Sequence, residues 1–279
     1  KAWSKAEMIA PKQFREEISP YFNANPKKYI SALVSEDCWQ ATPGKVVDLV
    51  RNLGIAAGGT VMEDCRVLEA CREGKYTSVL VQTHDKKYVE YRTEHFVNAL
   101  GSGAGKLCDS MGIDAGLYPV RHQAFITRRL PMLGKHGTNL DMLIDRQDYK
   151  GFSAVYGQQI AYTGQIIGCA SPKLDAMRID KNLKVNTKAF LEIVSEMFSE
   201  WIPDLAGVGI QAVWAGYYTE PRYIVDPELG LFVGMRGHGF MLSQYIARMY
   251  VDKLLGRPVP EYFEKLKLNG PGLSEKAFK

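Results

Sequence analysis

One segment constrains the fold of this chain more than any other: residues 230–255, GLFVGMRGHGFMLSQYIARMYVDKLL. An apolar strand, Leu231–Met235, runs through glycines at positions 234, 237 and 239 into an amphipathic helix from about Phe240 to Leu255, closed by Gly256 and Pro258. Glycine allows close approach of the backbone to another group, and a helix start offers free N–H groups and a positive dipole end. An anion or an electron-rich ring edge would suit that place. The alternative is a tight turn that binds nothing.

A second predicted strand followed by glycines occupies residues 95–107, HFVNALGSGAGKL. It does not fit the phosphate-loop pattern, because Leu100 and Leu107 stand where that loop needs a glycine and a hydroxyl. The dinucleotide fingerprint GxGxxG is absent throughout. The nearest string, GVGIQA at residues 207–212, follows a helix and a proline instead of a strand.

The remaining pattern predicts an α/β protein with two sheets. Pro43–Leu53 has helical spacing with Gly54 as its end, and Thr187–Trp201 has a helical apolar face stopped by Pro203. Residues 117–168 predict longer strands of a second, antiparallel sheet. Short strands are expected at Thr60–Met62, Arg66–Ala70, Thr77–Gln82, Tyr88–Tyr91 and His95–Leu100.

Composition excludes several classes of function. The formal charge of +4 is spread among acidic residues, which is typical of a solvated surface and not of a nucleic-acid-binding stripe. Five cysteines, at positions 38, 65, 71, 108 and 169, lack the spacing of a disulfide framework or a metal site, so we expect the cytoplasm or another reducing compartment, such as the mitochondrial matrix. No run approaches the roughly 20 apolar residues that span a bilayer.

Four segments occur in an order and spacing that resemble those of the D-amino-acid-oxidase-like flavoenzymes: VNALGSGAGKL, LYPVRHQAFIT, WAGYY and GLFVGMRGHGFML. That family includes glycine oxidase and the sarcosine and dimethylglycine dehydrogenases, and the resemblance covers essentially the whole chain. It implies FAD as cofactor, a flavin domain at residues 37–116 and 223–279, and an interleaved mixed or antiparallel-sheet substrate domain at residues 1–36 and 117–222. Family members open with a glycine-rich βαβ unit. We therefore expect that unit to lie outside these 279 residues, in a longer chain or in a second polypeptide.

The resemblance also implies which residues meet the cofactor. Val67 would offer backbone contacts near the adenine, and a second group would line the cofactor after its strand: Ala99, Gly101 and Ala104. A third group would approach the pyrimidine edge of the flavin, where a helix start stabilises the charge that accumulates on reduction: Gly237, His238, Gly239, Phe240 and Met241.

Five residues are candidates for the substrate side. Arg236 and Arg222 could hold a substrate carboxylate, although most arginines are surface residues. Tyr218, with Tyr217 as the alternative, matches a tyrosine that relatives bring over the flavin. His122 resembles the histidine of a PVxHQY element, although a lone histidine in a strand is more often structural.

The implied activity is oxidation of the C–N bond of a small secondary or N-methylated amino acid such as sarcosine, dimethylglycine or proline, by hydride transfer to flavin; the electron acceptor, whether oxygen, a quinone or a protein, stays open. Met241 stands where some sarcosine oxidases have a lysine, and the element after WAGYY is about three residues shorter than usual, which leaves the substrate open. An oxidase of a D-amino acid or 2-hydroxy acid is an alternative. Another is a non-catalytic assembly factor or subunit, because WAGYY also resembles a mitochondrial respiratory-complex assembly flavoprotein. We expect no metal site, no nucleic acid and no membrane span.

Overall fold

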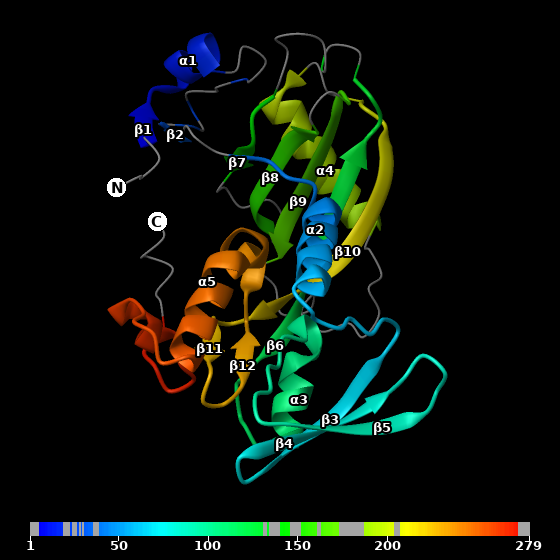
Figure 1. Ribbon diagram of the computed structural model, residues 1–279. Coiled ribbons are helices and arrows are strands. Elements are labelled where there is room, and N and C mark those ends of the chain that lie inside the picture. The colour runs from blue at the N-terminus through cyan, green and yellow to red at the C-terminus, as the bar shows by residue number, and fades with distance from the viewer. Residues whose placement is uncertain are drawn as a thin grey trace. The chain divides into compact units, whose positions relative to one another are not determined.

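The computed structural model describes residues 6–18, 23, 27, 29, 31–35, 39–130, 133, 140–145, 152–160, 163–172, 187–203 and 207–272. The chain forms two compact units (Figure 1). Unit 1 comprises residues 1–40 and 121–216, and unit 2 comprises residues 41–120 and 217–279. The domain limits expected from the sequence, at residues 36, 116 and 222, are near these in number. Which unit binds flavin and which binds substrate stays a prediction.

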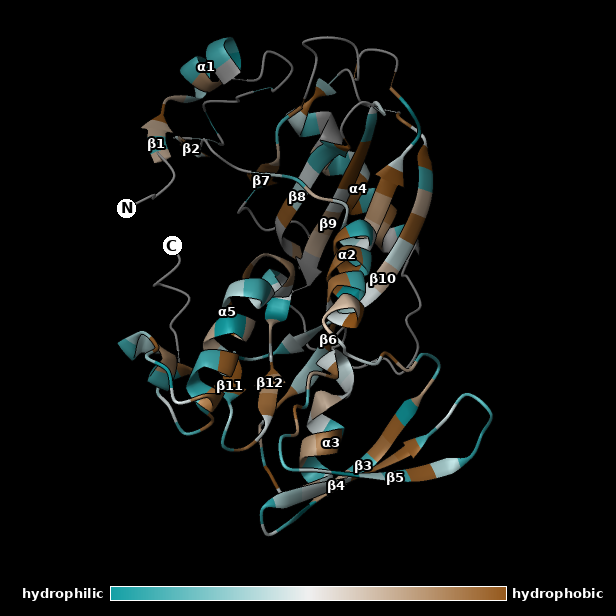
Figure 2. Ribbon diagram, viewed as in Figure 1, coloured by the Kyte–Doolittle hydropathy of each residue, from teal (hydrophilic) through white to brown (hydrophobic). Residues whose placement is uncertain are grey.

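Unit 1 contains a five-stranded sheet in the order β10-β6-β9-β8-β7. Strand β9 is antiparallel to both β6 and β8, and β8 is antiparallel to β7, as the sequence predicted for this region. The strands are β6 (Tyr118–Thr127), β7 (Leu143–Asp145), β8 (Phe152–Ile160), β9 (Gln165–Pro172) and β10 (Ile210–Glu220). Figure 2 shows the apolar colour of β9, in keeping with a strand that is central in the sheet.

Helix α4 (Thr187–Trp201) has the predicted bounds and covers the sheet of unit 1. Its apolar face is buried because residues at spacings of three and four lie on one side of a helix. Phe190 lies 6.1 Å, centroid to centroid, from Phe125 of β6 and 6.3 Å from Phe152 of β8. The other buried side chains of this face are Ile193, Val194, Met197 and Trp201, whereas the predicted Phe198 side chain lies outside the described ones.

The N-terminal segment contributes to the same core. Strands β1 (Ala6–Ile9) and β2 (Ala32–Ser35) pair antiparallel, and helix α1 (Pro11–Gln13) continues into a single π-helical turn, Phe14–Ile18. Ile9 and Phe14 belong to the cluster that includes the sheet and α4.

Unit 2 is layered around two helices. A meander of β3 (Arg66–Glu73), β4 (Tyr76–Gln82) and β5 (Tyr88–Thr93) packs its apolar face on Leu107 of α3 (Ala104–Ser110). The neighbouring residues Ala104 and Cys108 of α3 pack on the hairpin of β11 (Ile224–Asp226) and β12 (Leu231–Val233). Helix α3 therefore contacts both sheets of unit 2.

Helix α5 (Gly239–Leu254) packs on the other face of the same hairpin. Because successive residues of a strand point to opposite faces, Leu231 and Val233 meet α3, whereas Phe232 meets α5, with its ring 6.1 Å from that of Tyr250. A short 3-10 helix, Glu261–Leu266, adds Phe263 and Leu266 to the α5 side. The result is a hairpin with a helix on each face, the arrangement of an α/β fold.

The predicted strand His95–Leu100 is wrong in extent. Only Asn98 pairs, in a parallel bridge to Leu231, with its N–H donating to the oxygen of Gly230 (2.8 Å) and its C=O accepting from Phe232 N (3.0 Å). In a parallel pair, the N–H and C=O groups of one residue both bond the same neighbouring strand, here β12 for Asn98. The backbone groups of residues 97 and 99 therefore point away from β12. Neither makes a backbone hydrogen bond to any residue within the described ranges.

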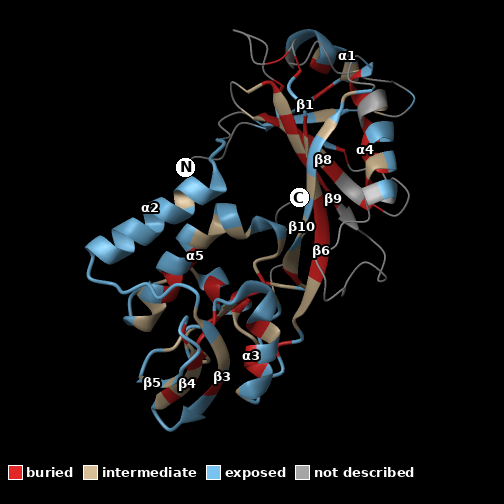
Figure 3. Ribbon diagram, turned by 90° about the vertical axis from the view of Figure 1, so that its right-hand side faces the viewer, coloured by how far each residue is buried: buried red, intermediate tan, exposed pale blue. Residues whose placement is uncertain are grey.

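Other sequence expectations also need correction. Helix α2 (Pro43–Ala56) passes through Gly54, because Gly58, with φ of +94°, ends it in the left-handed conformation instead. Thr60–Met62 is not a strand. Strand β12 ends at Val233 instead of Met235, because Gly234 turns the chain there. Figure 3 shows α2 exposed along its length.

Trp201 fixes the end of α4 to β7, and its removal tests the core of unit 1. Its indole N–H donates to Oδ2 of the buried Asp145 (3.0 Å), which also accepts from the Tyr29 hydroxyl (2.8 Å). We expect Trp201→Phe to lower the free energy of unfolding by about 1–3 kcal/mol, because a buried acceptor loses a donor. Trp214→Phe, at a side chain 41% exposed on β10, should change it by less than about 0.5 kcal/mol in the same urea titration. Equal effects of the two substitutions would contradict this account.

Candidate functional site

Two glycine corners of unit 2 form the candidate site. The first corner is residues 100–104, between the Asn98 bridge and α3, and the second corner is residues 234–239, between β12 and α5. Gly101 lies three residues after Asn98, and Gly234 lies three residues after Leu231, its partner in the bridge. Both glycines have a positive φ, +54° and +72°. Because the two strand segments run parallel, both corners lie at the same end of them.

Asn98 holds the first corner. Its side chain is fully buried, its Oδ1 accepts from Leu100 N–H (3.2 Å), and its Nδ2 donates to the Ala104 carbonyl (3.0 Å) and to Cys108 Sγ (3.4 Å). Between these anchors the main chain of Gly101, Ser102 and Gly103 is exposed. A Cβ added at Gly101 would meet no atom within 4 Å, so bare backbone faces open space here.

The second corner is held by residues 218–223. A Cβ at Gly234 would overlap the carbonyl oxygen of Arg222, and one at Gly237 would lie 2.8 Å from the Tyr218 ring. The corner therefore requires glycine for its own packing. Arg236 has a φ of +47°, unusual for a residue with a side chain, and its Nε lies 2.6 Å from Oε2 of Glu220.

The start of α5 is open to an electron-rich group. No side chain caps its N-terminus, and its first turn carries no acidic residue. The His238 ring is fixed from the side by a hydrogen bond between Nδ1 and the Tyr223 hydroxyl (2.9 Å). Phe240 and Met241 are 48% and 68% exposed. Free N–H groups and the helix dipole make this end electropositive.

The residues expected to meet the cofactor lie in three places in unit 2. Val67 is half-buried at a β-bulge of β3, where the register with β4 shifts between Val67 and Glu69. Ala99 and Gly101 are exposed at the first corner, whereas the methyl of Ala104 is buried, which leaves only its main chain for contact. The second corner and the start of α5 bring together the rest: Gly237, His238, Gly239, Phe240 and Met241.

Four of the five substrate-side candidates differ in their surroundings. The Tyr218 ring lies on Gly237 of the second corner, and Arg236 is ion-paired with Glu220 at a side chain 22% exposed. The guanidinium of Arg222 is bonded elsewhere, because Nη1 donates to the Gly270 carbonyl (3.1 Å) and Nη2 to that of Leu268. Tyr217 precedes Tyr218 on β10, so its side chain points to the opposite face of the strand.

His122, the remaining candidate, belongs to unit 1 and lies on β6 among the buried polar residues. Burial lowers the pKa of its imidazole to about 4. The ring is therefore uncharged near neutral pH and could serve as a neutral hydrogen-bonding group.

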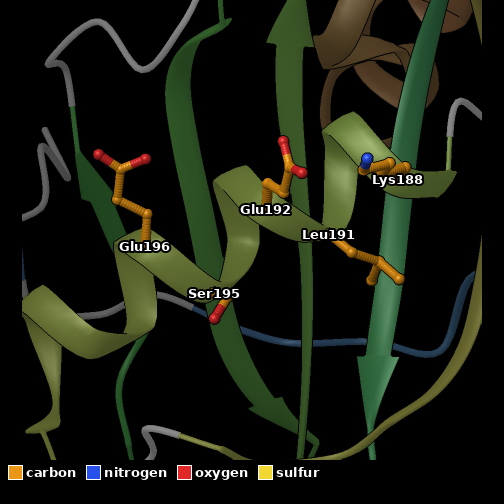
Figure 4. A pocket seen from close by; sticks show the side chains of 5 residues that line it. All are labelled: Lys188, Leu191, Glu192, Ser195 and Glu196. Carbon is orange, nitrogen blue, oxygen red and sulfur yellow. The ribbon is translucent and has the colours of Figure 1, made fainter.

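Other features of the described residues do not add to this site. A hollow on α4 is lined by Lys188, Leu191, Glu192, Ser195 and Glu196, all from one helix (Figure 4). Within the described ranges, no three His, Cys, Asp or Glu side chains are grouped to hold a metal ion, and no helix has the length and apolarity that a bilayer crossing requires. The described cysteines, at positions 65, 71, 108 and 169, are free thiols, and Cys38 lies outside the described residues.

Sequence reasoning missed three residues that shape the site: Asn98, Glu220 and Tyr223. Each acts through a tertiary contact: Asn98 holds the first corner, Glu220 pairs with Arg236, and Tyr223 bonds His238. For Asn98 a signal existed, since an amide inside an apolar strand just before a glycine turn is typical of a turn-forming residue. Nothing in the spacing of Glu220 or Tyr223 identifies their partners.

Comparisons with known proteins identify the family and the fold. A family model described as FAD dependent oxidoreductase (DAO) matches residues 2–253. The fold is similar to that of L-proline dehydrogenase from P. horikoshii, with 24% identity, a TM-score of 0.74, and coverage of 94% of this chain and 68% of that one. Glycine oxidase from Bacillus cereus (17% identity, TM-score 0.69, coverage 93% and 68%) and from Geobacillus kaustophilus (16%, 0.72, 95% and 67%) are also similar. A sequence search of curated proteins found no match.

The low pKa of His122 predicts a pH dependence of stability. The unfolded chain, with a histidine pKa of 6.5, takes up a proton between pH 6.5 and about 4 that the folded state does not. Above pH 6.5 His122 is neutral in both states and does not lower the free energy of unfolding. As the pH drops from 6.5 to about 4, the free energy of unfolding falls by about 3 kcal/mol in all. His122→Gln should flatten this part of the urea-unfolding profile, whereas His95→Gln, at an exposed residue, should leave the wild-type slope. An unchanged slope in the His122 variant would refute the assignment.

Proposed function

The chain belongs to the family of FAD-dependent oxidoreductases, and on that premise we propose that its substrate is a small secondary or N-methylated amino acid such as sarcosine, dimethylglycine or proline. The protein is an enzyme, and FAD is its cofactor. Bound FAD supplies the acceptor for the hydride that leaves the carbon next to the substrate nitrogen. The task of the chain is then to bind, orient and exclude water.

The pair of glycine corners is the observation that carries the proposal, because its properties fit a planar, electron-rich ring. The two corners lie at the same end of two parallel strand segments. The first corner presents bare main chain at Gly101, whereas the glycines of the second corner pack on Arg222 and Tyr218 and bring the exposed start of α5 to that end. The start of α5 adds N–H groups and a positive dipole end with no acidic side chain in its first turn. We propose that residues 237–241 meet the pyrimidine edge, where a fixed positive potential stabilises added negative charge. Ala99, Gly101 and the main chain of Ala104 would contact the cofactor from the first corner, and Val67 near its adenine end.

On the substrate side we assign orientation to Tyr218 and charge to Arg236. The ring of Tyr218 touches Gly237, so its hydroxyl belongs to the surroundings of the second corner. Arg236 carries its charge at the same corner, in an ion pair with Glu220. A substrate carboxylate would share that guanidinium with Glu220, because arginine has five N–H donors and can bond two acceptors. Arg222 is the weaker candidate because two carbonyls of residues 268–270 already bond its guanidinium.

A further proposal concerns the partner of the open strand edge. Residues 97 and 99 turn their N–H and C=O groups away from β12, and within the described residues nothing bonds them. Val97 and Leu100 are 45% and 43% exposed there, and α2 has no buried residue. We propose that a strand from outside these 279 residues, in the same polypeptide or a second one, pairs in parallel with this edge, because unpaired N–H and C=O groups at the edge of a sheet are a template for a further strand. Intact-mass measurement of the native particle distinguishes the two sources, and a particle containing these residues alone refutes both.

The proposed substrate class is tested by the absorption spectrum of the complete enzyme, with every polypeptide that co-purifies. We expect oxidised-flavin bands that bleach under anaerobic conditions with sarcosine, dimethylglycine or proline. Bleaching only with D-alanine or L-lactate would replace the class by a primary D-amino acid or a 2-hydroxy acid. Flavin bands that no amine bleaches, together with a fixed partner, would favour a non-catalytic subunit.

Tyr218→Phe tests the orienting role. The ring stays on Gly237, but the hydroxyl that would bond the substrate is lost, so kcat/KM should fall about tenfold or more, the effect of losing about 1.4 kcal/mol or more of transition-state binding. Flavin content should not change. Tyr217→Phe should have a smaller effect, since its side chain points to the other face of β10, and Tyr88→Phe on β5 should have none. An unchanged kcat/KM in the Tyr218 variant would remove this residue from the site.

A further inference from the structure

Asn98 connects the two glycine corners of unit 2 through its hydrogen bonds. Its backbone pairs with β12, the strand that leads to the second corner, through bonds to Gly230 and Phe232. Its side chain bonds Leu100 and Ala104, which bracket the first corner. A fully buried amide whose oxygen and nitrogen are both hydrogen-bonded has a single favourable orientation, because any rotation leaves a donor or an acceptor without a partner.

We propose that Asn98 is a positioning residue of the flavin site, which sets the bare main chain of residues 101–103 at a fixed place relative to the second corner. This inference rests on the proposed function. The amide acts on the exposed part of the loop, since Leu100 N–H comes just before Gly101 and the Ala104 carbonyl just after Gly103. An apolar side chain of the same size would fill the space but leave the Leu100 N–H without its acceptor and remove the donor that ties the Ala104 carbonyl to residue 98.

The packing of α3 does not depend on this amide alone. Ala104 and Cys108 are held against Ile224, Leu231 and Val233 by apolar contact. The far end of α3 is tied to β3 by Ser110, whose hydroxyl accepts from Ala70 N–H (3.1 Å) and lies 2.8 Å from the Leu107 oxygen. Loss of the Asn98 side chain is therefore expected to loosen the corner while α3 stays in place.

Two variants of the complete enzyme test the proposal. Asn98→Asp keeps the shape and an acceptor for Leu100 N–H but, when ionised, has no donor for the Ala104 carbonyl. Asn98→Ser is smaller, keeps the backbone bridge and loses the amide contacts. Ser110→Ala and Leu107→Ala are matched controls on the same helix, because they cost stability at its end and at its face toward β3 and β4 without touching the corner.

The readouts are the FAD dissociation constant of the apoprotein, the visible circular dichroism of the bound flavin, and the thermal midpoint of the apoprotein. We expect both Asn98 variants to bind FAD about tenfold or more weakly, with altered dichroism, whereas the controls bind within about twofold of wild type even where their midpoints fall as far. Asn98 variants that bind FAD like controls of equal midpoint would overturn the proposal. So would failure of both variants to fold when the controls fold, because Asn98 would then be a folding residue.

Amide hydrogen exchange separates this inference from the proposed function. Without FAD, residues 101–103 should exchange at least about tenfold faster in the Asn98 variants than in wild type, with residues 105–110 of α3 unchanged. If wild type binds no FAD, the proposed function fails, yet the exchange still reports the restraint. If wild type binds FAD and the exchange at the corner is unchanged, the positioning role fails by itself.

Discussion

The parallel pairing of Asn98 with Leu231 is the interaction on which the candidate site depends. Residues 98 and 231 are far apart in the sequence, yet two backbone hydrogen bonds set them side by side. Because pairing is parallel, the chain leaves both segments at the same end, where each turns at a glycine and enters a helix. An antiparallel pairing would have sent the corners to opposite ends of the hairpin. One local choice of strand direction therefore decides whether a common surface exists.

The second corner combines an unfavourable backbone conformation at Arg236 with an ion pair of its side chain. Arg236 holds a backbone conformation that costs a residue with a side chain of order 1 kcal/mol, and the ion pair with Glu220 offsets this by holding the side chain in place. The same ion pair neutralises the charge of the arginine. In the proposed site a substrate carboxylate would share the guanidinium with Glu220, so a substrate that also contacts the hydroxyl of Tyr218 would be favoured.

Much of the fold could be predicted from periodicity, and the reasons for the exceptions are physical. The bounds of α4 and the strands β6 and β8 follow from apolar spacing, since each buries one face against a large core. The end of α2 was wrongly predicted at Gly54, because several nearby glycines can take the left-handed conformation and the sequence does not show which one does. Residues 95–100 have the composition of a strand but one pairing partner only within the described residues, and partners are a tertiary property.

For the site, the glycine corners were visible in the sequence because strand, glycine and helix follow one another locally. Their mutual position was not, since it depends on a pairing across the chain. The interpretation of the glycines also changed, because Gly237 is required by the ring of Tyr218 and not only by an external group. The sequence does not distinguish the roles of Arg222 and Arg236, because the guanidinium of Arg222 bonds carbonyls and that of Arg236 pairs with a carboxylate only through tertiary contacts.

The two roles of Arg222 have a practical consequence for anyone who engineers this protein. Its carbonyl lies where any side chain at position 234 would be, and its guanidinium grips the main chain of residues 268–270. Trimming the polypeptide before residue 268, or fusing a bulky tag directly there, would release the guanidinium and with it the wall behind the turn into α5. Residues 268–270 thus support the turn at Gly234 through Arg222.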